Sequence, residues 1–446
     1  MQYAQRMGTE KVAKLVFNLG WPAALNFLVV TIYSITDILF VGRYVGPNAI
    51  AGTIIAGTAS FLCASVGMAV GIGGTSIIAR ALGKKDPDKA ALTLFHQHLL
   101  VISLSLTLVT TGWFLRDPIL HFFGSKGETF SPAMTYYRIL LIGVPFLAWS
   151  MMGNNVIHTQ GKAKIAMLNS LLPTIINMLL NGLLIGVFHM GVRGSAWATV
   201  TGYILNALLV IRFLRSRENE IVLHRRHMKI DMSVIREICA IGATVMLEII
   251  SVNIFTVVLN QIAFKYEQEM GLIIVGIATR LNFIFLIPVL GIESGIRPVI
   301  GYNFGSNQIS RVRQAIYLGG KYGVLICYGI FAGIVASGGL FLQFLTNDPH
   351  IARETQVALT IIYACFPFMM IQSVTSAYFQ AVGRPKIAFV LTLLRNFGLL
   401  IPGLYMMSWF FGFQGILFTF PLVDLLCAGT AFRLLRNEMH YRLVHG

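Results

Sequence analysis

GKAKIA at residues 161–166 and GRPKIA at residues 383–388 are nearly the same hexapeptide, and they lie 222 residues apart (383 − 161 = 222). The same spacing relates glycines at matching places, Gly20 with Gly242 and Gly83 with Gly305. Arginines three residues apart close each copy, at positions 212 and 215 and again at 433 and 436. A single glycine match arises easily by chance, but a spacing that is kept from end to end predicts a duplicated chain.

The composition places this duplicated chain in a membrane. Of its 446 residues, 56% are hydrophobic and only 12% are charged, and the mean hydropathy is +0.73. Because a soluble domain carries about 25% charged residues, this chain has too few polar side chains to cover a surface in water. It has enough apolar residues to cross a bilayer many times.

Twelve stretches reach the length of about 20 mostly apolar residues that a spanning helix needs. They cover residues 15–41, 50–73, 92–115, 134–157, 164–188, 194–214, 234–263, 272–302, 315–345, 356–382, 387–411 and 415–435. Turn and charge signals separate them, at residues 46–47, 83–89, 117–118, 161–162, 347–350 and 383–385. Candidate kinks within them are Pro22, Pro173, Pro298, Pro367 and Pro402. Because lipid offers no partner to unpaired backbone groups, and no alternating β-barrel pattern is present, we expect an all-α membrane protein.

The repeat divides these helices into two halves of six. An even number returns the chain to its starting side, so both halves enter the membrane in the same direction and the repeat is parallel. We expect a first lobe at residues 1–215, a basic linker at 216–232 and a second lobe at 233–446. Transporters of this construction bind their cargo between the halves and alternate its access to the two sides.

The basic residues gather in alternate loops and indicate the orientation. The net charge is +16. The rich loops carry Lys84, Lys85, Lys89, Lys162, Lys164, Arg212, Arg215, Arg217, Arg225, Arg226, Lys229, Arg311, Arg313, Arg384, Lys386, Arg433 and Arg436. By the positive-inside rule these loops and both termini face the cytoplasm, and the bases can contact anionic lipids. No aromatic-basic platform accompanies them, so we expect no nucleic-acid binding.

The remaining features of the chain fit a multi-pass membrane protein without a resident cofactor. The first apolar run is too long for a signal peptide and lacks a small-residue cleavage site. The five cysteines lie in apolar runs without metal or redox spacing, at positions 63, 239, 327, 365 and 427. No zinc-protease, nucleophile-elbow or phosphate-loop motif is present, so we expect no enzyme and no ATP-driven pump.

Polar residues inside the spans are candidates for the chemistry, because they are costly there. Asp37 lies near the outer end of the first segment, and Asn177 and Asn181 share one face of the fifth. Thr199 falls at a similar depth on the sixth. One carboxylate, two amides and a hydroxyl suit a hard cation such as sodium, and Asp37 could instead take a proton. The alternative is that these groups only hydrogen-bond the helices together.

A second acid, Glu248, falls near the middle of the seventh segment, at the place that Asn26 holds in the first half. It could attract an organic cation, relay a proton, or pair with a basic residue such as Arg280, Arg297 or Arg395. Asn154 and Asn155 lie nearer the inner end of their helix and are weaker candidates. Glu293 and Arg297 have the spacing of a structural ion pair, and Asp424 has no assignment.

Three motifs resemble the multidrug and toxic compound extrusion (MATE) transporters of bacteria. Residues 33–42 (YSITDILFVG) are similar to the family's first-helix signature, residues 295–305 (GIRPVIGYNFG) to its helix-eight motif, and residues 380–385 (QAVGRP) to the turn after its tenth helix. The resemblance runs from about residue 8 to residue 436. It implies a V-shaped pair of six-helix lobes in the inner membrane of a bacterial cell, and antiport of organic cations and drugs against sodium or protons.

The resemblance also implies roles for residues. It places the acid of a first-lobe cation site at Asp37, with Asn177 and Thr199 beside it. The aspartate that the family often carries one turn later is Asn181 here, which removes one negative charge. The helix-seven acid matches Glu248. The tenth helix, residues 367–379, has no acid and offers only Gln372.

These considerations define the expected site and its alternatives. We expect Asp37, Asn177, Asn181, Thr199 and Asn154 to couple transport to the cation, with Asp37 as the ligand if the cation is sodium. Glu248, Asn26, Gln372 and Tyr33 are the expected substrate-cavity residues. A flippase for a lipid-linked saccharide is the alternative function, although such a protein needs cationic groups for pyrophosphate where this first lobe offers acid and amides. We expect a monomer surrounded by membrane lipids.

Overall fold

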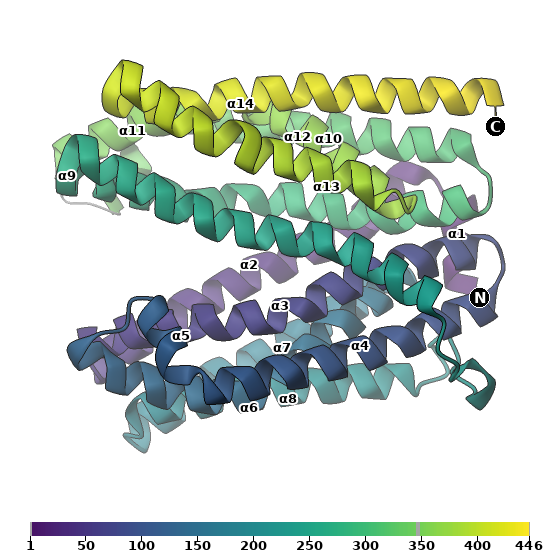
Figure 1. The fold of residues 1–446 in the computed structure, drawn as a ribbon, viewed down its shortest axis with the longest axis horizontal. Helices are drawn as coiled ribbons and strands as arrows, with labels where there is room; N and C mark the ends of the chain where they lie inside the picture. The colour runs from purple at the N-terminus through teal and green to yellow at the C-terminus, as the bar shows by residue number, and fades with distance from the viewer. Residues whose placement is uncertain (1, 345–347, 446) are drawn as a thin grey trace. The chain divides into compact units, whose positions relative to one another are not determined.

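The computed structural model describes residues 2–344 and 348–445, and these two ranges are helical without a strand (Figure 1). The predicted end of the ninth segment at residue 345, the turn residue 347 and the two terminal residues lie outside them. The α-helices are α1 (Gln2–Thr9), α2 (Val12–Tyr44), α3 (Pro47–Gly83), α4 (Pro87–Phe114), α5 (Arg116–Phe122), α6 (Phe130–Thr159), α7 (Ala163–Asn181), α8 (Gly191–Leu214), α9 (Met232–Gly305), α10 (Ile309–Ala336), α11 (Pro349–Tyr363), α12 (Phe366–Ala381), α13 (Pro385–Leu393) and α14 (Ile401–His445).

Shorter elements complete this list. Two π-helical segments continue α7 and α13, namely η2 (Gly182–Val187) and η5 (Leu394–Leu400). Three 3₁₀ turns are η1 (Gly127–Thr129), η3 (Arg225–His227) and η4 (Leu340–Phe344).

The described helices account for the twelve predicted spans. Nine of them are long and apolar enough to cross a membrane, and α11 with α12 forms a tenth span that is bent by 46°. Two of the nine contain a break: α9 turns at Gln268, with φ 49°, and the span of Pro385–His440, made of α13, η5 and α14, turns at Gly412, with φ 59°. Counting the two pieces of each broken helix brings the spans from ten to twelve. The predicted all-α fold is confirmed.

The bend between α11 and α12 has a local cause. Pro367 is the second residue of α12, and α11 ends four residues before it at Tyr363. A proline ring clashes with the carbonyl four residues earlier and has no N–H to donate to it. One continuous helix is therefore unfavourable here. By contrast, Pro22, Pro173 and Pro298 lie inside helices that continue through them.

The surface is as apolar as a lipid-facing surface must be. Large side chains stand out from the helices, with Phe122 85%, Phe114 77% and Trp409 76% exposed. Scattered apolar residues are normal on soluble proteins, but exposure along so many helices is not. It is expected where the surrounding solvent is hydrocarbon.

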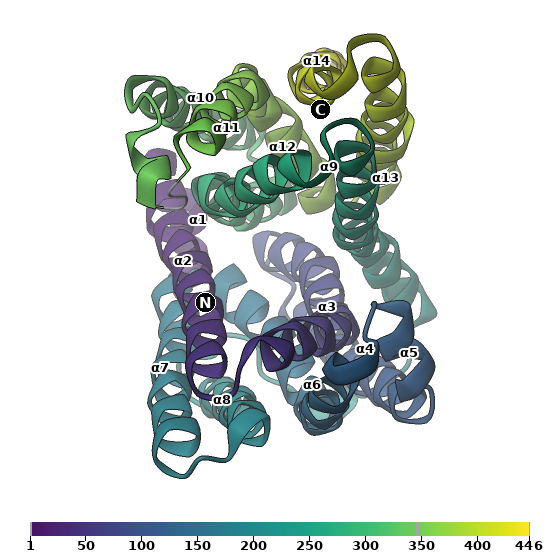
Figure 2. The same ribbon diagram turned by 90° about the vertical axis from the view of Figure 1, so that its left-hand side faces the viewer.

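The chain forms two compact units. Unit 1 holds residues 1–10, 22–246 and 301–307, and unit 2 holds residues 11–21, 247–300 and 308–446. In unit 1, α3 packs on α6 and α4, and α8 packs on α6 and α7 (Figure 2). In unit 2, α12 packs on α10, α13 and α14 (Figure 2). The division into lobes at 1–215, 216–232 and 233–446 stays a prediction.

Close helix contacts repeat with the spacing read from the sequence. Within unit 1, a Cβ atom added to Gly83 would lie 2.0 Å from the carbonyl oxygen of Tyr302, and one added to Gly305 would lie 2.1 Å from that of Arg80. Residues 80 and 302, like 83 and 305, are 222 apart, so the residue that Gly83 contacts is the repeat equivalent of the residue that Gly305 contacts. Only glycine allows two helix backbones to approach this closely.

The same exchange holds for a contact in each unit. A Cβ atom at Gly73 would lie 2.4 Å from the carbonyl oxygen of Ile238 in unit 1, and one at Gly295 would lie 2.6 Å from that of Val16 in unit 2. Residues 73 and 295, and residues 16 and 238, again differ by 222. The duplication is therefore present in the packing as well as in the sequence.

Candidate functional site

Asp37 of α2 is the centre of a buried polar cluster in unit 1. Its side chain is 8% exposed, and its carboxylate accepts hydrogen bonds from three helices. Asn181 Nδ2 of α7 donates to Oδ1 over 2.9 Å, and Ser195 Oγ of α8 donates to the same oxygen over 2.7 Å. Tyr136 Oη of α6 donates to Oδ2 over 3.3 Å. Three donors stabilise a carboxylate in its ionised form.

The cluster continues along α7 and α8. Asn181 Nδ2 also donates to Asn177 Oδ1 over 3.2 Å, and Asn177 Nδ2 donates to Thr199 Oγ1 over 3.3 Å. The Tyr33 hydroxyl is hydrogen-bonded to Thr199 Oγ1 over 3.0 Å. The structure thus brings together Asp37, the two asparagines and Thr199, and it adds Tyr33, which we had expected in the substrate cavity.

The sequence reasoning missed Ser195 and Tyr136. Ser195 lies four residues before Thr199 and therefore on the same helix face, so the helical spacing could have found it. Tyr136 lies near the start of α6, far from the other members along the chain. No local pattern marks it, and only tertiary packing brings its hydroxyl to Asp37.

One oxygen of the cluster has no partner. Asn181 Oδ1 is buried and accepts no hydrogen bond in the described part of the chain. Unpaired buried acceptors are costly, and they are often found where an ion or water binds. With the Asp37 carboxylate and Asn177 Oδ1 nearby, this oxygen fits the all-oxygen surroundings that a hard cation prefers. The π-helical segment η2 begins directly after Asn181, and such segments are frequent at functional sites.

Asn154 belongs to a different cluster of unit 1. Its Nδ2 donates to Asn206 Oδ1 over 3.0 Å, and Asn169 and Ser170 lie at 3.5 Å from its amide. Asn154 is 18 residues beyond Tyr136 on α6, which corresponds to about 27 Å along the helix. The structure therefore does not bring Asn154 to Asp37.

In unit 2, Glu248 of α9 is an acidic residue without a direct partner among the described residues. Its side chain is exposed, and no hydrogen bond or ion pair of its carboxylate occurs in residues 2–344 and 348–445. The charges of Glu293, Arg297 and Arg395 act on it. Glu248 therefore belongs to a charged cluster and does not face hydrocarbon alone.

Two ion pairs occupy the arginines of this cluster. Arg297 Nη2 lies 2.8 Å from Glu293 Oε2, four residues earlier on α9, as the spacing predicted. Arg395 Nη2 of η5 lies 3.1 Å from Asp424 Oδ1 of α14. Asp424, which had no assignment from the sequence, thus neutralises Arg395. Glu248 remains as the acid that no arginine of the cluster pairs with directly.

The other expected cavity residues each offer an acceptor. Asn26 Oδ1 in unit 1 and Gln372 Oε1 in unit 2 are buried and have no hydrogen-bond partner within the described residues. Gln372 itself is 8% exposed. No group of three or more histidine, cysteine or acidic side chains that could hold a metal ion occurs in residues 2–344 and 348–445.

Comparison with known proteins finds relatives along nearly the whole chain. The family model MatE matches twice, at residues 22–183 and 244–406, and the two matches begin 222 residues apart. "Multidrug export protein MepA" of Staphylococcus haemolyticus is 24% identical over 439 residues, covering 96% of this chain and 95% of that protein.

Solved structures share the fold. One, described as the "outward-facing conformation of a multidrug resistance MATE family transporter of the MOP superfamily", superposes with a TM-score of 0.92 at 22% identity and covers 99% of this chain and 98% of its own. A second, from Pyrococcus furiosus, has a TM-score of 0.90 at 22% identity and covers 98% and 97%. Its description reads "reverse polarity of binding pocket suggests different function of a MOP superfamily transporter".

Proposed function

Because this chain belongs to the MatE family, we propose that it exports drugs, chiefly organic cations, out of the bacterial cell. Export takes place in exchange for a coupling cation. A relative that matches nearly the whole chain is a multidrug export protein, which supports export of several compounds. The coupling cation is a proton or sodium, and its site is the Asp37 cluster.

The observation that carries this proposal is the setting of Asp37. A lone carboxylate, 8% exposed, is held by donors from α6, α7 and α8 beside the unpartnered Asn181 Oδ1. Binding of a proton or of sodium removes the negative charge that these three donors stabilise. The hydrogen bonds then weaken and the helices can repack, which links occupancy of Asp37 to a change between inward and outward access.

Substrate binding is assigned to Glu248 in unit 2. Because Glu293 and Asp424 occupy Arg297 and Arg395, the charge left for a ligand near Glu248 is negative. A negative site selects organic cations over anions. In the same unit, the unpartnered Gln372 Oε1 can accept a hydrogen bond from an N–H group of such a cation.

The proposal is tested in proteoliposomes that contain the purified protein and a fluorescent lipophilic cation such as ethidium. We expect transport when either a pH gradient or a sodium gradient is imposed alone, and the effective gradient identifies the coupling cation. Failure of both gradients, under conditions in which the protein is folded, would overturn cation-coupled export.

The Asp37→Asn variant is the sharpest form of this test. Asparagine keeps the size and can still accept a hydrogen bond, but it cannot gain or lose a charge. We expect gradient-driven efflux to fall to the level of empty liposomes, because a neutral amide can neither take up a proton nor balance the charge of sodium. The matched control is Asn154→Ala in the other cluster, which we expect to retain transport. Undiminished efflux from folded Asp37→Asn would falsify the assignment.

A further inference from the structure

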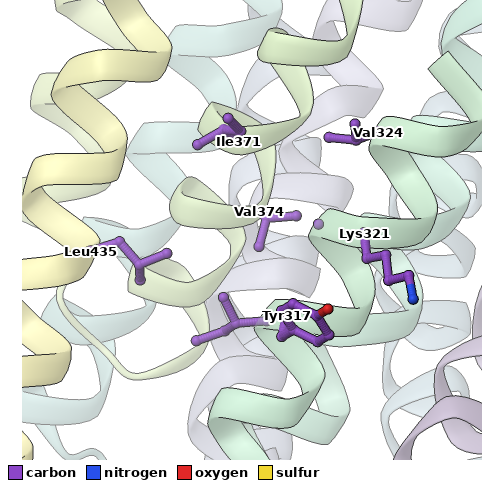
Figure 3. A pocket seen from close by; sticks show the side chains of 8 residues that line it. Tyr317, Lys321, Val324, Ile371, Val374 and Leu435 are labelled. Atoms are coloured by element: carbon purple, nitrogen blue, oxygen red, sulfur yellow. The ribbon is translucent and has the colours of Figure 1, made fainter. Parts of the chain in front are cut away.

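A hollow of about 270 Å³ opens on unit 2 between α10, α12 and α14. Figure 3 shows its apolar lining, with Val324 from α10, Ile371 and Val374 from α12, and Leu435 from α14. Polar atoms lie only at one edge, where the Tyr317 hydroxyl and the Lys321 ammonium both point away from Val374 and Leu435 (Figure 3). The hollow is thus apolar, with a hydroxyl and an ammonium at its edge.

The first half of the chain fills the equivalent place. Helices α4 and α10 have the same length of 28 residues and begin 222 residues apart, so Gly320 corresponds to His98. Ile371 corresponds to Trp149 of α6 in the same way. In unit 1 the rings of His98 and Trp149 pack with centroids 5.5 Å apart. In unit 2 the ring is missing, and a Cβ atom added to Gly320 would meet nothing within 4 Å.

The edge of the hollow carries an uncompensated charge. Lys321 is exposed and forms no ion pair or hydrogen bond within the described residues, and Tyr317 is 65% exposed. Lys321 lies eight residues beyond Arg313 on α10, or about 12 Å along the helix. Its four-carbon stem can bring the ammonium back toward that end, as lysines near the membrane surface do. An ammonium on a lipid-facing helix needs an anionic partner, and no carboxylate lines the hollow.

Basic residues surround the same end of unit 2. Arg313 Nη2 donates to the carbonyl of Met439 of α14, which places the start of α10 level with the last turns of α14. Arg433 and Arg436 of α14, which flank Leu435 in the sequence, are both exposed. By the positive-inside rule this end faces the cytoplasmic leaflet, where the anionic lipids of a bacterial membrane are accessible.

We propose that this hollow is a binding site for one anionic phospholipid. An acyl chain occupies the apolar space that Gly320 leaves open, against Val324, Val374 and Leu435. The phosphate binds the Lys321 ammonium and accepts a hydrogen bond from the Tyr317 hydroxyl. The site does not depend on the export function, because none of these residues belongs to the Asp37 or Glu248 cluster.

The experiment is native mass spectrometry of the full-length protein with phosphatidylglycerol or with phosphatidylcholine of the same acyl chains. We expect the wild type to retain one phosphatidylglycerol in preference to phosphatidylcholine. In Lys321→Ala this retention should fall about ten-fold, the effect of losing one charge-assisted hydrogen bond. Lys321→Arg should keep it. The control Lys265→Ala removes another exposed lysine of unit 2, which contacts Tyr266, and should leave retention unchanged.

A second variant tests the hollow separately from the charge. Gly320→His combined with Ile371→Trp copies the ring pair of the first half, and we expect it to exclude the acyl chain and lose the lipid while Lys321 remains. Equal retention of both lipids by the wild type would overturn the proposal, as would unchanged retention in Lys321→Ala or in the filled variant. Displacement by inorganic phosphate would also overturn it, because the ligand would then be a free anion.

Discussion

At the scale of single residues, the Asp37 cluster combines one charge with many neutral partners. Asp37 is the only acid among its members, and Asn181, Ser195 and Tyr136 all act as donors toward it. A carboxylate in a low-dielectric site needs such donors to remain ionised. The cluster is therefore poised to bind a single positive charge, and a change of one neutral member to an acid should alter which cation it binds.

Asn181→Asp is expected to strengthen sodium binding. It places a second carboxylate where the Asn181 amide now lies 2.9 Å from Asp37. Two carboxylates at this distance cannot both be ionised without a cation between them. We expect the sodium concentration for half-maximal efflux to fall by about ten-fold. Asn154→Asp, which adds an acid to the separate amide cluster, is the control. A sodium response that matches the wild type would contradict the prediction.

At the scale of helices, the close approach of neighbouring helix backbones depends on a few glycines. The ends of α3 and α9 cross with Gly83 and Gly305 between them, and each would place a Cβ atom about 2 Å from a carbonyl oxygen of the other helix. Nothing flexible can move away there, because the opposing atoms are backbone. The helices must separate to admit a side chain.

Gly83→Val and Gly305→Val should therefore destabilise the protein equally, since the two glycines make repeat-equivalent contacts. Overpacking of this kind typically costs about 1–3 kcal/mol. The loss is measured as a lower melting temperature of the purified protein in detergent. Gly329→Ala of α10 is the control, because a Cβ atom there meets nothing within 4 Å. A normal melting temperature for either valine variant would show that the crossing is looser than the structure has it.

The ion pair between Arg395 and Asp424 joins η5, which continues α13, to α14. Asp424→Asn leaves the guanidinium of Arg395, whose side chain is 22% exposed, without its acid. Breaking a buried pair by removing one partner costs about 3 kcal/mol, whereas removing both charges costs much less. We expect a clear loss of thermal stability in Asp424→Asn and recovery in the double variant with Arg395→Gln. Equal stability of the single and double variants would mean that the pair contributes nothing.

At the scale of the whole molecule, the basic segment between the halves, residues 216–232, packs against helices of unit 1. Lys162 Nζ donates to the carbonyl of Glu218 over 2.7 Å, and Gln160 Nε2 donates to Asn219 Oδ1 over 3.0 Å. Arg226 pairs with Asp88, and the Asp231 amide donates to His96 Nε2. Hydrogen bonds from Ser233 hold the pKa of Asp231 below its usual value, so this residue is an ionised cap of α9 at neutral pH. The expected linker is thus an ordered part of unit 1.

The orientation of the molecule gives a further prediction. Lys126 lies in the loop after the third span, and Lys229 lies in the basic segment; both are exposed. We expect Lys126→Cys to react with a membrane-impermeant maleimide on intact cells, and Lys229→Cys to react only after the inner membrane is permeabilised. The unsubstituted protein controls for its five cysteines. The opposite labelling would reverse the topology.

The sequence by itself determined the fold class, the twelve spans and the register of the duplication. Apolar length and a constant spacing are local properties of a chain in lipid, because each spanning helix satisfies its own backbone. It also singled out Asp37, Asn177, Asn181 and Thr199, since a charge in a span is costly and helical spacing puts residues on one face.

Only the tertiary structure decided which helices complete each cluster. Tyr136 reaches Asp37 from α6, and Asp424 neutralises Arg395 from α14, across distances along the chain that no pattern predicts. The structure also separated Asn154 from Asp37 and left the hollow at Gly320 open. The physical reason is that contacts between helices depend on how whole surfaces pack, whereas the helices themselves depend on local composition.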